Sequence, residues 1–225
     1  MTGRFGPDRD ERGVSGLLEV TVVLLILGLI LGTLYSTIFS SQNTVLNTNE
    51  RLRNLDEART LIATLTKDVR TAVRLRAGTS PFVTAQARAA EFYANLDTAG
   101  APVKVRLSID GDDQLIEEVW TATSCIRDPD SDEDPYLYEG DPTVRLVGHF
   151  VANSAAEPLF TYLDETNVPI AQPISGTRLL DIDAVRIDLR VKRDSGHPVN
   201  ETTIQNRVRL PNVDYKAEAP ECPAG

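Results

Sequence analysis

The sequence predicts an α+β fold, in which a long N-terminal helix packs on a mostly antiparallel β-sheet head. Three features predict it: an apolar run near the N-terminus, a stripe of apolar residues at helical spacing behind it, and alternating segments in the rest of the chain. The 225 residues divide into five parts. These are a leader at 1–13, a transmembrane half of the helix at 14–40, an amphipathic continuation at 41–78, a β-rich head at 79–210 and an irregular tail at 211–225.

The apolar run covers residues 17–39 and contains one ionisable residue, Glu19, and no proline. At about 1.5 Å per residue, a helix of this length crosses roughly 30 Å of hydrocarbon. Because lipid leaves backbone polar groups without partners, a lone spanning segment must be helical. We therefore predict a single-pass membrane helix. A carboxylate in such a helix is costly and marks a functional residue by default.

Behind the span, the apolar residues narrow to one stripe with a spacing of three or four. The stripe consists of Leu55, Ala58, Ile62, Leu65, Val69, Ala72 and Val73. We assign the charged residues of this stretch, Asp68 among them, to the opposite face of an amphipathic helix. Gly78 is a typical stop signal, so the pattern predicts one helix from about Leu17 to Ala77.

Beyond Gly78, apolar and polar residues alternate, as is typical of strands with one buried face. Residues 110–113 predict a hairpin turn, and 184–192 is expected to pair with the last strand. The predicted strands are 82–86, 90–96, 103–110, 114–122, 143–151, 158–162, 184–192 and 202–210.

The net charge of −10 belongs mainly to the distal part of the chain, where residues 78–225 contain 13 basic and 25 acidic side chains. Such a surface repels phosphate backbones, so nucleic acid is not expected as a direct partner. The sequence contains no GxSxG, HExxH, P-loop or GxGxxG motif, and we expect no enzymatic activity.

Two further groups of residues are candidate sites. Cys125 and Cys222 can form a disulfide if the head lies outside the cytoplasm, and the alternative is two separate thiols. An acidic loop places carboxylates in a pattern similar to a calcium loop, but Glu133 stands where that loop needs glycine. We expect a solvated acidic loop and no cofactor, with Ca²⁺ in another geometry as the alternative. The candidate ligands are Asp128, Asp130, Asp132, Asp134 and Glu139.

The stretch 12–20, RGVSGLLEV, and the apolar run behind it resemble the N-terminus of type IV pilin-like prepilins. Residues 67–72 and 92–95, with the late paired strands, look most like J-type minor pseudopilins and related minor pilins. The resemblance implies a pilin-like fold, cleavage after a glycine by prepilin peptidase, and methylation of the new N-terminus.

The expected cut lies between Gly13 and Val14, and the alternative cut lies between Gly16 and Leu17. In the family, glutamate is normally the fifth residue after the cut, whereas here Glu19 would be the sixth or the third. Gly16 looks like a one-residue insertion.

The resemblance implies that Glu19 pairs with the free α-amino group of a neighbouring subunit and thereby sets the register of a filament. The alternative is that Glu19 extends to the membrane interface. The implied function is that of a minor pilin or pseudopilin, a structural subunit of a prokaryotic type II secretion or type IV pilus-like filament. The implied partners are other pilins, bound through the N-terminal helix.

The implied location is the cytoplasmic membrane, with the head outside, and then the pilus or pseudopilus. A different class of function stays open: a membrane-anchored extracellular binding protein or adhesin with an uncleaved signal anchor.

Overall fold

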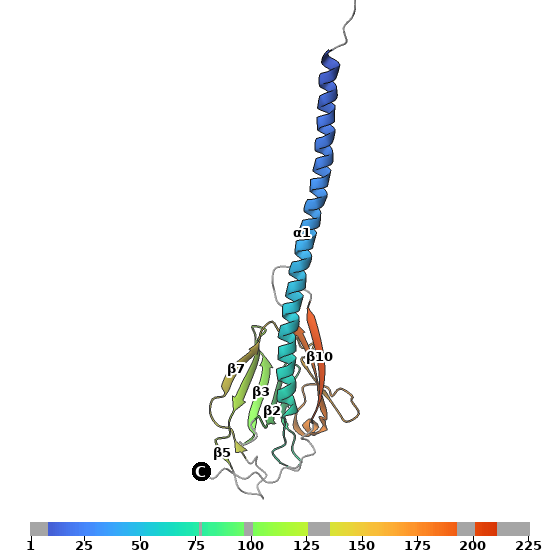
Figure 1. Cartoon of the computed structure of the whole chain (residues 1–225). Coiled ribbons are helices and arrows are strands. Elements are labelled where there is room, and N and C mark those ends of the chain that lie inside the picture. Colours follow the sequence, from blue (N-terminus) through green and yellow to red (C-terminus); the bar gives the residue numbers. More distant parts are fainter. Residues whose placement is uncertain (1–8, 77, 97–100, 126–135, 193–200, 211–225) are drawn as a thin grey trace, which may run out of the picture. The chain divides into compact units, whose positions relative to one another are not determined.

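The computed structural model describes residues 9–76, 78–96, 101–125, 136–192 and 201–210. Side chains are described from residue 16 onward, apart from that of Cys125. The chain forms two compact units, Met1–Asn49 and Glu50–Gly225. The α+β prediction is confirmed, because a long N-terminal helix packs on antiparallel sheets (Figure 1).

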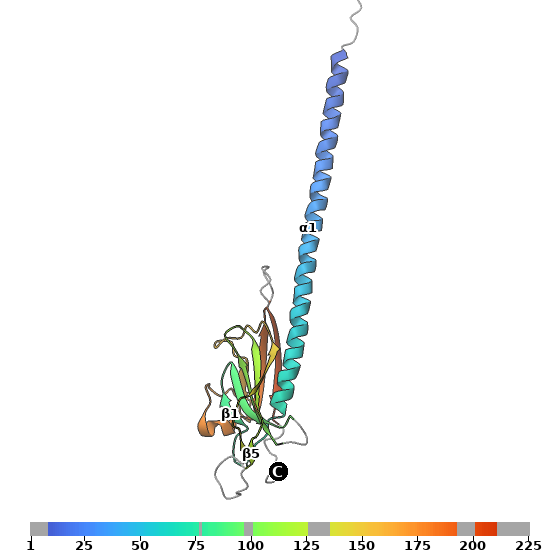
Figure 2. The same cartoon turned by 90° about the vertical axis from the view of Figure 1, so that its left-hand side faces the viewer.

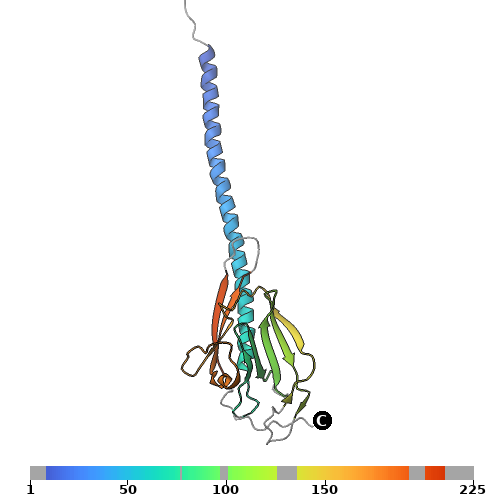
Figure 3. The ribbon, with the colours of Figure 1, turned by 180° about the vertical axis from the view of Figure 1, so that it is seen from behind.

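Helix α1 (Arg9–Arg70) begins within the segment that the sequence assigns to the leader. In the second unit most of its predicted apolar stripe is buried: Ala58, Leu65 and Val69 have no exposed surface. Leu61, which the predicted stripe did not include, is 1% exposed, and Leu55 is only partly buried. In Figures 1 and 3 this part of α1 lies between β10 on one side and β2 and β3 on the other. The second half of the helix is therefore part of the core of the head, as its amphipathic pattern predicts.

The larger sheet has five strands in the order β1-β2-β3-β4-β7, and all its neighbouring pairs are antiparallel. Its inner face supplies Phe92, Leu107 and Leu115 to the core. The strands are β1 (Phe82–Ala85), β2 (Ala89–Ala94), β3 (Val103–Ile109), β4 (Leu115–Trp120) and β7 (Thr143–Gly148).

The smaller sheet has three antiparallel strands in the order β10-β9-β8. Its strands are β8 (Phe160–Leu163), β9 (Ala184–Val191) and β10 (Thr202–Arg209). The predicted pairing of the last two strands is confirmed over eight residue pairs, from Val191 with Thr202 to Ala184 with Arg209. Figure 2, a view turned by 90°, shows β1 of the larger sheet on the side away from α1.

Three short elements were not predicted. The strands β5 (Ser124–Cys125) and β6 (Tyr136–Leu137) form a two-stranded sheet, and η1 (Gly176–Asp181) is a 3₁₀ helix. Two-residue strands and a six-residue 3₁₀ helix are too short to produce a period that sequence analysis can detect.

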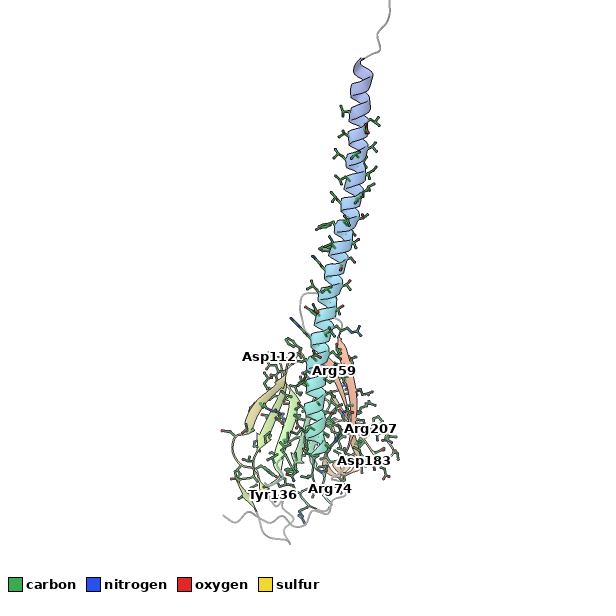
Figure 4. All side chains as sticks on the ribbon, viewed as in Figure 1. Arg59, Arg74, Asp112, Tyr136, Asp183 and Arg207 are labelled. Atoms are coloured by element: carbon green, nitrogen blue, oxygen red, sulfur yellow. The ribbon has the colours of Figure 1, made fainter. Side chains whose placement is uncertain are left out.

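The predicted turn between β3 and β4 is confirmed. One carboxylate oxygen of Asp110 accepts hydrogen bonds from the backbone N–H groups of Asp112 and Gln114, each at 2.9 Å. Asp113 adopts a positive φ of 57°, which aspartate tolerates better than most residues. Figure 4 labels Asp112 at this turn.

The prediction that the helix continues to Ala77 is wrong, because α1 ends at Arg70. The next residues pair with the end of β2 instead: Val73 N–H donates to the Tyr93 carbonyl at 2.8 Å, and Asn95 N–H donates to the Thr71 carbonyl at 3.0 Å. Thr71 and Val73 thus form their backbone hydrogen bonds with residues 93–95 and not within a further helical turn. Tertiary pairing therefore overrides the local helical pattern.

Candidate functional site

The first candidate site is the surface of α1 over residues 17–39, here called the apolar helix surface. Its large apolar side chains are all exposed, from 46% at Val22 to 71% at Tyr35. Figure 4 shows these side chains around the helix. Among the described residues, α1 is the one helix long and apolar enough to cross a membrane. So large an apolar surface needs lipid or another protein to cover it.

The threonine hydroxyls on this surface are hydrogen-bonded within the helix. Thr21 donates to the Leu18 carbonyl at 2.8 Å, and Thr33 donates to the Ile30 carbonyl at 2.8 Å. Thr37 donates to the Thr33 carbonyl at 2.9 Å. Because each hydroxyl donates to a carbonyl in the preceding turn of the helix, these threonines are compatible with an apolar surrounding.

Glu19 lies on α1 within the apolar helix surface and is exposed. No hydrogen bond or ion pair to Glu19 is formed by any of the residues that the structure describes. Its carboxylate is therefore available for a partner outside the chain, and a partner is needed if lipid or protein covers the surface.

The residues of the expected cut lie along α1. Gly13 and Val14 both lie in its helical backbone. Gly16 and Leu17, at the alternative cut, are exposed, with no neighbouring atom within 4 Å of an added Cβ at Gly16. Both cuts remain predictions.

The other sequence-derived candidates fall mostly outside the described residues. Asp128, Asp130, Asp132, Asp134 and Cys222 lie in undescribed segments, so neither the calcium site nor the disulfide is tested. The remaining members are separated: Glu139 is exposed beyond β6, and Cys125 ends β5. In the described part of the chain, no group of three or more His, Cys, Asp or Glu residues could hold a metal ion.

A group of three charged residues, two of them buried, connects the end of α1 to the larger sheet. Asp68 on α1 and Glu117 on β4 are each 4% exposed. Arg145 on β7 forms an ion pair with Glu117, with 2.6 Å between Nε and Oε2. We call these three residues the Asp68 cluster.

The carboxyl group of Asp68 titrates close to neutral pH. Burial raises its pKa from 3.8 to about 6, with a further increase from the charge of Glu117, while Arg145 and Lys67 lower it. A protonated Asp68 can donate a hydrogen bond to Glu117, which forms the ion pair with Arg145.

The assignment of Asp68 to the solvent face is wrong. It lies three residues after Leu65 and four before Ala72, and this spacing places it on the buried stripe. The position of this acid on the apolar stripe was the signal in the sequence that it could be buried. Its partners, Glu117 on β4 and Arg145 on β7, are distant in the chain and could not be assigned from the sequence.

Two surface clefts in the second unit had no sequence signal, because each is built from loops that are separated in the chain. One, of about 760 Å³, is lined by charged residues that include Arg74, Asp181 and Asp183. Figure 4 labels Arg74 and Asp183. The other, of about 740 Å³, lies between the β1–β2 turn and the loops on either side of β8 and includes Arg88 and Thr161.

No family model matches the chain, and neither the curated proteins nor the solved structures include a significant match to it. The fold and the two-part helix are therefore the features on which a functional proposal rests.

Proposed function

We propose that the chain is a minor pilin or pseudopilin, a structural subunit of a type II secretion or type IV pilus-like filament. The single observation that carries the proposal is the division of α1. Its residues 17–39 are apolar and exposed, whereas its second half is buried against antiparallel sheets. A subunit stored in a membrane and then assembled through its N-terminal helix needs both halves.

In the proposed mechanism, the apolar helix surface is first covered by lipid and then by the helices of neighbouring subunits. The apolar side chains are kept from water both in the membrane and in the filament. Moving the helix from the membrane into the filament therefore replaces one apolar surrounding by another. The head stays folded during this exchange, because its core includes the second half of the helix. Prepilin peptidase and other pilins are the proposed partners, and the head is proposed to lie outside the cytoplasmic membrane.

Glu19 is proposed to fix the contact between neighbouring subunits. A carboxylate enclosed by apolar helices is stable only with a partner. Cleavage after Gly13 would create an α-amino group at Val14, and that group of an adjacent subunit would supply the partner. Without cleavage, the nearest positive charge along the chain would be a side chain of the leader.

A Glu19→Ala variant tests this role. We expect it to insert into the membrane as the parent does and to be depleted in the sheared filament fraction by about tenfold, which corresponds to the loss of one charge-assisted contact. The measurement is the ratio of filament to membrane protein in cells that assemble the filament, by immunoblotting of both fractions.

Thr21→Ala is the matched control, because it removes a hydroxyl whose hydrogen bond stays inside the same helix. Its filament fraction should equal that of the parent. Normal incorporation of Glu19→Ala would leave Glu19 without the proposed role.

A membrane-anchored binding protein with an uncleaved anchor is the second candidate. The two open clefts in the second unit favour it, since a ligand-binding head would need such a feature. The two candidates differ in whether the N-terminus is processed.

A further inference from the structure

Strand β7 ends the larger sheet on one side, and its outer edge is open. Its backbone pairs with β4 along the other edge. Beyond that pairing, residues 143–147 form no backbone hydrogen bond with any of the described residues. In Figure 1, β7 lies on the opposite side of α1 from β10. An open edge of this kind is a template for pairing with a further extended chain.

The other end strands of the larger and smaller sheets, β1, β8 and β10, are protected. Ile174 N–H donates to the Ala85 carbonyl of β1 at 3.0 Å, and Ile170 N–H donates to the Tyr162 carbonyl of β8 at 2.9 Å. Strand β10 presents polar side chains to solvent, and bonded or polar edges resist pairing with other chains. The exposed residues of β10 are Thr203, Gln205, Arg207 and Arg209.

The edge of β7 is instead apolar on one face of the sheet. Val144 is 60% exposed and Leu146 is 46% exposed. Because they lie two residues apart, both side chains point to the same face, where Leu146 stands opposite the partly buried Ile116 of β4. The apolar side chains of a further strand on this face would cover them.

Arg145, between these two residues, is the one charged residue of β7. Its side chain is 57% exposed, although its Nε donates to Glu117. Its two Nη atoms form no hydrogen bond with another described residue. A second copy of β7 placed alongside would add another arginine and no carboxylate. An acidic side chain would complement the charge, so a different segment suits this edge better than a second copy does.

We propose that β7 is the docking strand for an extended segment of another protein. That segment carries apolar side chains at alternate positions and an acidic side chain opposite Arg145. It adds one further strand to the larger sheet, with backbone hydrogen bonds for affinity and alternate side chains for specificity. The inference does not depend on the filament role, because the edge lies in the second unit and is present with or without cleavage of the N-terminus.

Titration of the ¹⁵N-labelled full-length protein in detergent micelles with the peptide acetyl-TVEVTVT-amide tests the proposal. Its valines lie on one face of an extended chain and its glutamate on the other. We expect amide shifts at residues 143–147 and slower hydrogen exchange of the β7 N–H groups that point away from β4. The same peptide with lysine in place of glutamate should bind about fivefold more weakly, because an attraction to Arg145 becomes a repulsion.

N-methylation of the peptide distinguishes strand pairing from other binding. Alternate N–H groups of a strand point to opposite sides, so only one of two neighbouring residues donates to β7. Methylation at the glutamate or at the valine after it should therefore abolish binding in one peptide and preserve it in the other. Loss of binding in both peptides, or in neither, would contradict the pairing.

Variants of the protein locate the binding. A Val144→Ser, Leu146→Ser double variant should keep its melting temperature, since both side chains are exposed, and should bind the glutamate peptide at least about tenfold more weakly. Val168→Ser is the matched control, because Val168 is a 55% exposed apolar residue away from β7. It should bind as the parent does.

The proposal is overturned if no peptide binds at millimolar concentration, if the glutamate and lysine peptides bind equally, or if Val168→Ser weakens binding as much as the double variant. Sedimentation of the parent in density-matched detergent should show a monomer. A dimer that the double variant loses would assign the edge to a second copy and would also contradict the proposal.

Discussion

Asp68 places a carboxyl group in the packed contact between α1 and the larger sheet, where burial and the neighbouring Glu117 raise its pKa to about 6. A group whose pKa is higher in the folded state than in the unfolded chain favours folding when it is protonated. Its contribution is present in full below about pH 4 and is lost as the pH rises through 6. The charged form of Asp68 is thus a liability at neutral pH, and Arg145 compensates only part of it.

An Asp68→Asn variant should therefore be more stable than the parent at pH 8, by up to about 3 kcal/mol, because a shift of one pKa unit corresponds to about 1.4 kcal/mol. The two proteins should approach each other in stability at pH 4. Denaturant unfolding in detergent, followed by the fluorescence of the single tryptophan, Trp120 on β4, measures the head.

Asp56→Asn is the control on the same helix, because its side chain is 80% exposed. It should leave the pH dependence unchanged. Equal pH dependence of the parent and Asp68→Asn between pH 4 and 8 would show that Asp68 does not titrate as described.

The limit of sequence reasoning at this scale is clear from Asp68 and Thr161. Residue type predicts an exposed acid, and helical spacing predicts a buried position, so the two local signals conflict at Asp68. Only the positions of β4 and β7 decide between them. The unsatisfied hydroxyl of Thr161 has no sequence signal, because the absence of a partner is a property of the assembled fold.

At the scale of elements, α1 and β7 meet at a close approach. Gly148 ends β7, and a Cβ atom added there would overlap Cδ2 of Leu61 and lie 2.8 Å from its Cδ1. Leu61 is 1% exposed and has little room to move. The absence of a side chain at Gly148 therefore allows the helix to pack directly on the end of the strand.

Gly148→Ala should destabilise the head by about 1–3 kcal/mol through overpacking. Leu61→Ala alone also destabilises the core, but it makes room for the added methyl group, so the Gly148→Ala, Leu61→Ala double variant should lose less stability than the sum of the two single losses. The free energy of unfolding, again from Trp120 fluorescence, measures both effects.

Gly111→Ala, in the β3–β4 turn, is the control, since nothing lies within 4 Å of an added Cβ there. Additive effects of the changes at Gly148 and Leu61 would contradict the described contact.

Strands β2, β3 and β9 could be predicted well because each has one buried face, which appears in the sequence as period-two alternation. Strand β9, for example, alternates between buried and partly exposed residues over most of its length. The C-terminal end of α1 could not be predicted, because the bonds of Thr71 and Val73 to residues 93–95 depend on where β2 lies. Register across long loops is likewise invisible to a local pattern.

At the scale of the whole molecule, one helix serves two different surroundings. The first unit presents an apolar surface that the described chain leaves exposed, and the second unit contains its own core. The pattern of apolar residues predicted this division, because residues 17–39 are apolar on all sides of the helix, whereas the later residues form a single apolar stripe. The proposed filament role follows from the division, together with the resemblance of residues 12–20 to prepilins.

The central claim is that the N-terminus is processed before assembly. Intact-mass analysis and N-terminal sequencing of the membrane-extracted protein test it most directly, in cells with an active prepilin peptidase and in matched cells without it. We predict a chain that begins at Val14 and carries an N-methyl group when the peptidase is active, and an unprocessed chain when it is absent. A start at Met1 or Thr2 in both cell types would contradict the pilin proposal and favour an uncleaved anchor.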